Sequence, residues 1–587
     1  MRERPGLRGS GQVWGATELR GTRSHGAAAS YELGDYEKVV VNSALWAAAG
    51  DALGWMTELS RGTGGVKYRT GTDSVVEPMA WKRLIGGKFG VTVDLPAGTY
   101  SDDTQLRPSA SRAIRGDGAF DVEAFAKIEV TVWQGYCLGA GIGSKAAASN
   151  LSKRGVNWFS NFFKTDRQSY TTAGGNGAAM RVQPHVWSAR NSTGMLTNVL
   201  RDALVTHGHP HGFCGAVFHA MCLWGSIERR RIPTLDEARG FMENIPPLSG
   251  LVNEDGDLSS FWLPAWEREA GKSLSVALQQ FHEEAVRDFE LIDRLFHSNE
   301  NANYHDILTE LGCLRERCRG SGFKTAFAAL LLAQVYGPDG IESALVVAAN
   351  ELDSDTDTIA TMAAALLGAV AKRSPSWAVQ DREYIEREAI RMAHIAFERR
   401  PPSFEYPDLA GWTPPSNQSD AIVQLNGSLA LAGFGPVSPK SRDYESRGSV
   451  WQWFELDNSQ RIFAKRRANS VAKASKSQFS PERTKKSVTE APEQGERTMQ
   501  GRFDIGAKAN NGVTRAERPE RRKGPEGRNF QGHDAASAEV ISSGFDDATL
   551  GRAINQCIDQ TGSIEEAVSL SAIVAKAKLA RKRRGKR

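Results

Sequence analysis

Three stretches of the chain are apolar almost all the way around a helix, and they constrain the fold more than any other feature. They read V-V-V-N-S-A-L-W-A-A-A-G-D-A-L-G (39–54), K-T-A-F-A-A-L-L-L-A-Q-V-Y (324–336) and I-A-T-M-A-A-A-L-L-G-A-V-A (359–371). Their apolar residues recur at three- and four-residue steps, and their alanines allow close contact between helices. Such helices are expected at the centre of a large helical bundle. Because no strand–helix–strand alternation accompanies them, we predict an all-α body over residues 31–400.

The pattern changes after Pro401. The segments P-P-S-F-E-Y-P and G-W-T-P-P-S contain proline stops and are typical of a chain that crosses the surface. Further on, V-W-Q-W-F-E-L-D-N-S-Q-R-I-F-A-K-R-R (450–467) predicts two short strands around a D-N-S-Q turn. We therefore expect residues 401–467 to form a surface crossing and a small β-hairpin appended to the helical body.

The two ends of the chain have compositions typical of segments outside the main fold. We predict a disordered arm over residues 1–30 and a disordered linker, rich in Lys, Ser, Glu, Gly and Pro, over 468–534. Helical periodicity returns in residues 535–587, whose last twelve residues (576–587) hold eight basic residues and no acidic one. Without those eight, the chain has 65 basic against 69 acidic residues. The basic character is therefore a flexible C-terminal feature, either a solvated tail or a contact for nucleic acid.

Cysteine content and hydropathy indicate the compartment. The six cysteines include no C-x-x-C pair, which favours a reduced environment over a disulfide scaffold. No run of 18 apolar residues exists, and the basic N-terminus is not followed by the apolar region of a secretory signal. We therefore expect a cytoplasmic protein without contact to a membrane.

Two acidic clusters stand about 250 residues apart, each directly before a helical stretch. The first is Y-S-D-D-T-Q-L (100–106), and the second is E-L-D-S-D-T-D-T-I-A-T-M-A (351–363). Adjacent carboxylates repel each other unless a proton or a cation intervenes. Carboxylate and hydroxyl oxygens without His or Cys suit a hard cation, Mg²⁺ or Mn²⁺, and two such clusters can hold two ions about 4 Å apart. The alternative is ordinary helix capping by Asp and Thr.

Two loops between these clusters have the composition of a ligand-binding surface. In G-G-N-G (174–177) the glycines allow backbone N–H groups to approach a pyrophosphate, although a simple turn before a helix has the same composition. In T-H-G-H-P-H (206–211) the histidines at two-residue spacing favour a surface that faces substrate, with a zinc site as the competing interpretation. Glu58 follows an apolar helix and, by spacing alone, is also explained as a solvated helix end.

Taken together, five stretches resemble the ADP-ribosylglycohydrolases, the family of the dinitrogenase reductase-activating glycohydrolase. In chain order they are G-D-A-L-G-W-M-T-E (50–58), S-D-D-T (101–104), G-G-N-G-A-A-M-R (174–181), T-H-G-H-P-H (206–211) and D-T-D-T-I-A-T-M-A (355–363). The resemblance implies an all-α fold with a centre of two magnesium ions at the mouth of a cleft. The linker and the C-terminal tail lie outside it.

The resemblance also implies roles for individual residues. Two sets would bind the metal ions: Ser101, Asp102 and Asp103, and then Asp355, Asp357 and Thr358. Four residues would line the site for ADP-ribose: Gly175, Asn176, Gly177 and His207. Glu58 matches the acidic residue beside the metals, and either Glu58 or Asp103 would serve as the general base.

The implied activity is hydrolysis of the bond between ribose C1 of ADP-ribose and an acceptor. The substrate would be an ADP-ribosylated protein or a small-molecule conjugate of ADP-ribose, joined through an N- or O-glycosidic bond. A different class of function is an immunity-type protein that blocks an ADP-ribosylating toxin or transferase without catalysis. The arm over residues 1–30 would suit such blocking.

Overall fold

The structure is a computed structural model that describes residues 27–299, 302–314, 318–480 and 533–562, together with 566–568, 570–571, 573–575 and 577–578. The chain divides into two compact units, residues 1–493 and 494–587. Most of the predicted arm (1–30) and linker (468–534), and nearly all of the basic end (576–587), lie outside the described residues. The blocking and nucleic-acid alternatives therefore stay predictions.

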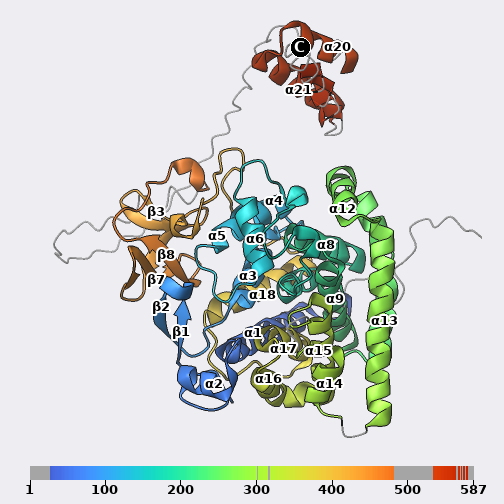
Figure 1. The fold of residues 1–587 in the computed structure, drawn as a ribbon, viewed down its shortest axis with the longest axis vertical. Helices are drawn as coiled ribbons and strands as arrows, with labels where there is room; N and C mark the ends of the chain where they lie inside the picture. The colour runs from blue at the N-terminus through green and yellow to red at the C-terminus, as the bar shows by residue number, and fades with distance from the viewer. Residues whose placement is uncertain are drawn as a thin grey trace, which may run out of the picture. The chain divides into compact units, whose positions relative to one another are not determined.

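The centre of the first unit is helical, as predicted (Figure 1). Helix α1 (Leu33–Thr57) packs most extensively against α17 (Thr356–Val370). Helices α9 (Pro210–Arg229) and α15 (Gly322–Tyr336) pack against each other and against α17. The small-residue segments of α1, α15 and α17 are buried on nearly every side, which confirms the predicted helical bundle.

The other helices surround this centre, and the long α13 runs along one side of the body (Figure 1). Their bounds are α2 (Gly62–Thr70), α3 (Asp102–Ala113), α4 (Val122–Ala124), α5 (Val130–Trp133), α6 (Ile142–Leu151), α7 (Gln183–Trp187), α8 (Ser192–Thr206), α10 (Leu235–Phe241), α11 (Leu248–Glu254), α12 (Leu263–Ala270), α13 (Leu274–Ser298), α14 (Tyr304–Leu311), α16 (Ile341–Asn350) and α18 (Arg382–Ala396). A π-helical turn, η3 (Phe125–Glu129), joins α4 to α5.

Two glycines allow the backbones of α1 and α17 to touch. A Cβ atom on Gly50 would lie 2.6 Å from the carbonyl oxygen of Ala360, and one on Gly54 would lie 2.3 Å from that of Thr356 and 2.5 Å from Cα of Asp357. These are distances to backbone atoms, which cannot rotate away as a side chain would. Gly54 therefore sets how closely the N-terminus of α17 approaches α1.

We expect a Gly54→Ala substitution to lower the free energy of unfolding by about 1–3 kcal/mol, because the methyl group overpacks a backbone contact. The matched control is Gly240→Ala in α10, where a Cβ atom meets nothing within 4 Å. That control should be neutral or stabilising by up to about 1 kcal/mol. Urea unfolding of both variants measures the difference, and equal effects would contradict the close contact.

The body also contains a hairpin that the all-α prediction missed. Strands β1 (Trp81–Ile85) and β2 (Val91–Leu95) are antiparallel, with Trp81 opposite Leu95. In β2, V-T-V-D-L alternates buried and exposed residues, which is the period of a half-buried strand. Five residues are too few for this alternation to outweigh the helical periodicity around it.

The predicted hairpin over 450–467 is confirmed, but it belongs to a larger sheet. Strand β7 (Ser449–Leu456) pairs with β8 (Arg461–Arg467) in antiparallel register, from Ser449 opposite Arg467 to Glu455 opposite Arg461. The sheet continues in the order β3-β4-β5-β7-β6. Its other strands, missed within the predicted surface crossing, are β3 (Ile422–Leu425), β4 (Ser428–Leu431), β5 (Gly435–Pro439) and β6 (Tyr444–Ser446). They are short, and β5 contains two prolines, which argue against a strand.

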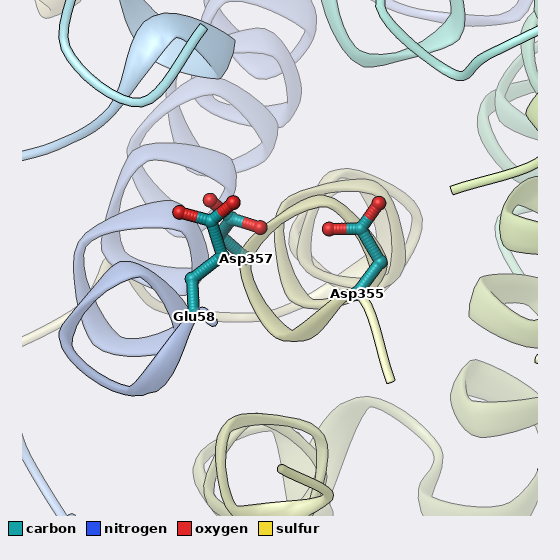
Figure 2. Close-up of side chains that lie close together, drawn as sticks. All are labelled: Glu58, Asp355 and Asp357. Atoms are coloured by element: carbon teal, nitrogen blue, oxygen red, sulfur yellow. The ribbon is translucent and has the colours of Figure 1, made fainter. Parts of the chain in front are cut away.

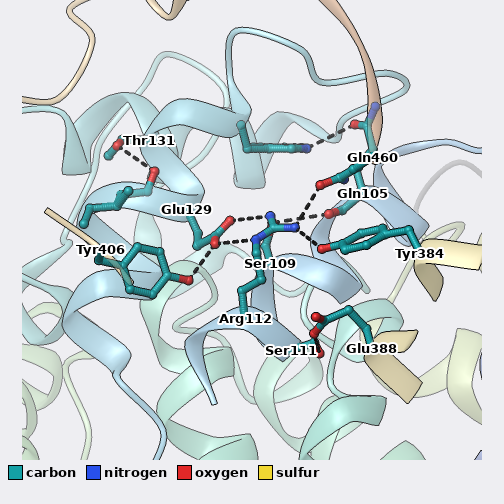
Figure 3. Close-up of polar contacts among 12 residues, drawn as sticks. Gln105, Ser109, Ser111, Arg112, Glu129, Thr131, Tyr384, Glu388, Tyr406 and Gln460 are labelled. Carbon is teal, nitrogen blue, oxygen red and sulfur yellow. Dashed lines mark hydrogen bonds and ion pairs between the residues drawn. The ribbon is translucent and has the colours of Figure 1, made fainter. Parts of the chain in front are cut away.

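A buried polar network fastens this sheet region to the body (Figure 3). Arg112 of α3 forms an ion pair of 2.7 Å with Glu129 of η3, and both side chains are almost fully buried. Arg112 also donates to Tyr384 Oη at 2.6 Å and to Gln460 Oε1 at 2.8 Å, in the turn between β7 and β8. Glu129 accepts from Tyr406 Oη at 2.6 Å. The helix that begins with Asp102 and Asp103 thus ends in contacts with residues beyond position 400.

The second unit contains α20 (His533–Ser542) and α21 (Asp547–Thr561). Its small apolar core includes Val540, Phe545, Cys557 and Leu570. Among the helices that the structure describes in either unit, none has both the length and the apolar character needed to cross a membrane.

Candidate functional site

The two acidic clusters of the sequence meet at the N-termini of α3 and α17. Thr358 Oγ1 lies 3.4 Å from Asp103 Oδ1, although 255 residues separate them in the chain. Ser101 is the N-cap of α3 and accepts a hydrogen bond from the N–H of Asp103 at 3.3 Å. Asp355 occupies the N-cap position of α17 without a side-chain capping bond. Capping therefore explains Ser101 but not the carboxylate of Asp355.

Glu58, at the end of α1, joins the second cluster. One carboxylate oxygen each from Glu58, Asp355 and Asp357 lies within 4.8 Å of the other two, and the three side chains converge (Figure 2). Among the described residues this is the one group of three or more His, Cys, Asp or Glu side chains close enough to hold a metal ion. Asp353, in the same loop, is exposed instead.

Asp51 is a member of the site that sequence reasoning did not assign. It is fully buried in α1, and its carboxylate accepts from the backbone N–H of Ser101 at 3.0 Å and of Thr104 at 2.9 Å. It therefore fixes the start of α3, where Asp102 and Asp103 lie. The sequence does carry a signal for Asp51: it is an ionisable residue inside an apolar helix, two turns before Glu58. An unpaired charge inside such a helix is costly.

Four carboxyl groups of the site have a pKa raised from the ordinary range. In each, burial is the largest cause and the charge of a neighbouring carboxylate adds to it; the four are Glu58, Asp102, Asp103 and Asp357. Burial also raises the pKa of a fifth, Asp51. Arg83 of β1 opposes this shift at Glu58, with its Nη2 atom 2.9 Å from Glu58 Oε2. The missed β1–β2 hairpin thus supplies the cation that orients Glu58.

The site has the chemistry of a divalent-cation centre. Asp103 Oδ2 is buried and has no hydrogen-bond partner among the described residues. Leaving a buried carboxylate oxygen without a partner is costly, and several such groups together repel each other. A hard cation would satisfy the free oxygen and offset the repulsion, and all-oxygen donors are the set that Mg²⁺ and Mn²⁺ prefer. The residues present therefore fit the implied metal.

The glycine-rich loop contacts the second acidic cluster directly. Asn176 Nδ2 donates to Asp355 Oδ2 at 2.7 Å, and its backbone N–H donates to the carbonyl oxygen of Gly320 at 2.9 Å. A Cβ atom on Gly177 would lie 2.6 Å from Ser144 Oγ and 3.0 Å from Cε1 of His207. The structure thus places 175–177 beside both Asp355 and His207, as a ligand-binding loop would be.

The histidines do not gather as zinc ligands. His207 is buried, its Nδ1 atom lies 2.7 Å from Thr206 Oγ1, and burial lowers its pKa to about 3, so that the ring is neutral. His211 Nε2 lies 3.0 Å from Glu284 Oε2, while His209 Nδ1 accepts the N–H of His211. No metal-ligating group that includes them occurs in the described part of the chain, which leaves the zinc interpretation without support.

The sequence of the chain matches a known protein family. The sequence model of the ADP-ribosylglycohydrolases matches residues 35–402, which include every site residue named above. One solved chain, from a structure described as an ADP-ribosylglycohydrolase-related protein complex, is 19% identical, with a TM-score of 0.38. The match covers 62% of this chain and 99% of that one. On the strength of the family match, which spans more than half of its residues, the chain belongs to the ADP-ribosylglycohydrolase family and is a glycohydrolase.

Proposed function

We propose that the protein is a magnesium-dependent hydrolase that removes ADP-ribose from a modified acceptor by breaking the glycosidic bond at ribose C1. The observation that carries this proposal is the convergence of the carboxylates of Glu58, Asp355 and Asp357 beside the start of α3. There Asp103, which lies next to Thr358, has a buried Oδ2 atom with no hydrogen-bond partner among the described residues. Within the family fold, such a cluster would face the scissile sugar.

The metal ligands would be the two sets expected from the sequence: Ser101, Asp102 and Asp103, and then Asp355, Asp357 and Thr358. When bound, two Mg²⁺ ions, or Mn²⁺ ions of the same hardness, would supply positive charge that holds the ribose hydroxyls and a water molecule.

The chain's own groups have separate tasks. Positive charge develops on the sugar ring as the glycosidic bond breaks, and the surrounding carboxylates would stabilise it. Glu58 and Asp103 are the candidates for accepting the proton of water: Arg83 orients the first, and the second has an oxygen free of donors. The loop over 175–177 would hold the pyrophosphate through the backbone N–H groups of Gly175 and Gly177, since that of Asn176 already donates to Gly320. Neutral His207 would add a hydrogen bond without adding charge.

The direct test is release of free ADP-ribose from arginine-modified and serine-modified proteins, with Mg²⁺ and with EDTA. We expect release from one of the two substrates in Mg²⁺ and none in EDTA. Release that persists in EDTA would contradict the metal requirement. No release from either substrate, by protein that binds Mg²⁺, would contradict hydrolysis of these two acceptor bonds.

A further inference from the structure

A cleft of about 690 Å³ lies between the helical body and the appended sheet. The body contributes Asp94 and residues 379–384 to its lining, and the sheet region contributes residues between 440 and 461. Its volume falls in the range of ligand pockets. The sheet side lies beyond residue 402, where the family match ends, so this cleft is distinct from the acidic site.

Two residues of the lining each carry a buried polar atom that has no hydrogen-bond partner among the residues that the structure describes. Asp381 Oδ1 is on a side chain with no exposed surface, and the nearest cation, Nε of Arg461, is 3.8 Å away, which is too far for a hydrogen bond. The other oxygen of this carboxylate accepts from Tyr100 Oη at 2.7 Å and from the N–H of Arg461 at 2.9 Å. Trp453 Nε1 on the sheet side is likewise buried without an acceptor.

The backbone at Asp381 is also strained. Its φ angle of 58° is in the left-handed region, which is uncommon for a residue other than glycine. Such strain costs about 1–3 kcal/mol and is concentrated at functional sites. Here it places a carboxylate in the wall of the cleft. Because Tyr100 precedes Ser101, the same carboxylate is one hydrogen bond away from the loop of the first acidic cluster.

The lining of the cleft has a net charge of −1, because three basic residues stand against four acidic ones, Asp94, Asp381, Glu383 and Glu455. Lys440 and Arg461 both face Glu455, at 2.9 and 3.7 Å. The side chain of Arg382 is hydrogen-bonded to the backbone, since its Nη2 atom donates to the carbonyl oxygens of residues 375 and 377. The exposed Glu383 adds another negative charge to the partly unsatisfied carboxylate of Asp381. The ligand that fits therefore carries a positive donor.

We propose that this cleft binds a peptide segment through an arginine side chain. The guanidinium would donate to Asp381 Oδ1 and would lie beside the aromatic side chains of Tyr444 and Trp453 in the lining, of which Tyr444 already has Arg442 of the chain over its ring. A backbone carbonyl of the same peptide would accept from Trp453 Nε1. A peptide supplies both the donor and the acceptor that the two partnerless atoms need, whereas a simple cation supplies neither a hydrogen-bond acceptor nor a planar face.

The test is calorimetric titration of the full chain with a blocked Gly–Arg–Gly peptide and with its Gly–citrulline–Gly twin, which has the same shape without the charge. We expect the citrulline peptide to bind at least about tenfold more weakly, the size of a charge-assisted hydrogen bond to a buried group. Titrations in Mg²⁺ and in EDTA keep the result independent of the proposed hydrolysis.

Substitutions in the lining test whether the arginine peptide binds in the cleft. Asp381→Asn should weaken binding of the arginine peptide at least about tenfold, and Glu383→Gln, at an exposed position, by a smaller factor. Glu405→Gln, at an exposed position outside the lining, is the matched control and should bind as the wild type does. Equal affinity for the two peptides, unchanged affinity in both cleft variants, no binding to the wild type, or a loss caused by Asp357→Asn instead would each overturn the proposal.

Discussion

An Asp357→Asn variant should lose more than about a hundredfold of the magnesium-dependent hydrolysis, because even residues that only support a metal ligand cost 10–100-fold when replaced. Asp357 is buried, and one of its oxygens lies within 4.8 Å of oxygens of Glu58 and Asp355. The amide keeps the shape of the side chain but removes the charge that a divalent cation needs.

The same variant should be more stable than the wild type when no metal is present. Removing one buried charge relieves repulsion among the carboxylates, and we expect a gain of about 1–3 kcal/mol in the free energy of unfolding in EDTA. Thermal unfolding in EDTA and in Mg²⁺ measures both effects, since Mg²⁺ should stabilise only the wild type. Asp353→Asn, at the exposed position of the same loop, is the matched control and should change neither quantity. A Mg²⁺-induced shift retained by Asp357→Asn would rule out this carboxylate as a ligand.

A Glu129→Gln variant should lose about 3–5 kcal/mol of folding free energy, the cost of leaving one member of a buried ion pair without its partner. The guanidinium of Arg112 would remain buried with a weakened contact to residue 129 and with neutral acceptors, the oxygens of Ser109, Tyr384 and Gln460. Chemical unfolding measures the loss.

The matched control for that variant is Glu290→Gln, which removes the same charge from an exposed pair with Arg294. Its effect should stay below about 1 kcal/mol. Replacing both buried partners, as in Arg112→Met with Glu129→Leu, should recover part of the loss, because no unpaired charge is then left inside. A Glu129→Gln variant as stable as the Glu290→Gln control would show that the network does not hold the fold together.

The helical centre was predictable from the sequence because its cause is local. Small residues recur with helical period in α1, α15 and α17, and the helices they form bury those residues. The strands β3 to β6 were not predictable in this way, because each has only three to five residues and their identity as strands depends on pairing with one another and with β7. The hairpin β7–β8 was predictable, since its longer strands enclose a recognisable turn.

The site shows the same division between local and long-range causes. The pattern of acidic residues singled out Asp102, Asp103, Asp355 and Asp357, but nothing in the spacing showed that the two clusters meet. Asp51 lies within the stretch 50–58, but its contact with Ser101 could not be inferred from that stretch. Arg83 carries no motif, because its role consists of its contact with Glu58. Single polar residues of this kind become visible only when the partner segments are brought together.

The contact between Arg112 and Gln460 also has a consequence for synthesis on the ribosome. The two residues are 348 positions apart, so at 5–20 residues per second the guanidinium emerges roughly 20–70 s before its last partner. During that interval the end of α3 cannot take its final buried place without leaving the guanidinium of Arg112 short of one acceptor, although its charge is already paired with Glu129. A chain that stopped at residue 402, where the family match ends, would lack Gln460 altogether. We therefore expect such a shortened chain to depend on chaperones more than the full chain does.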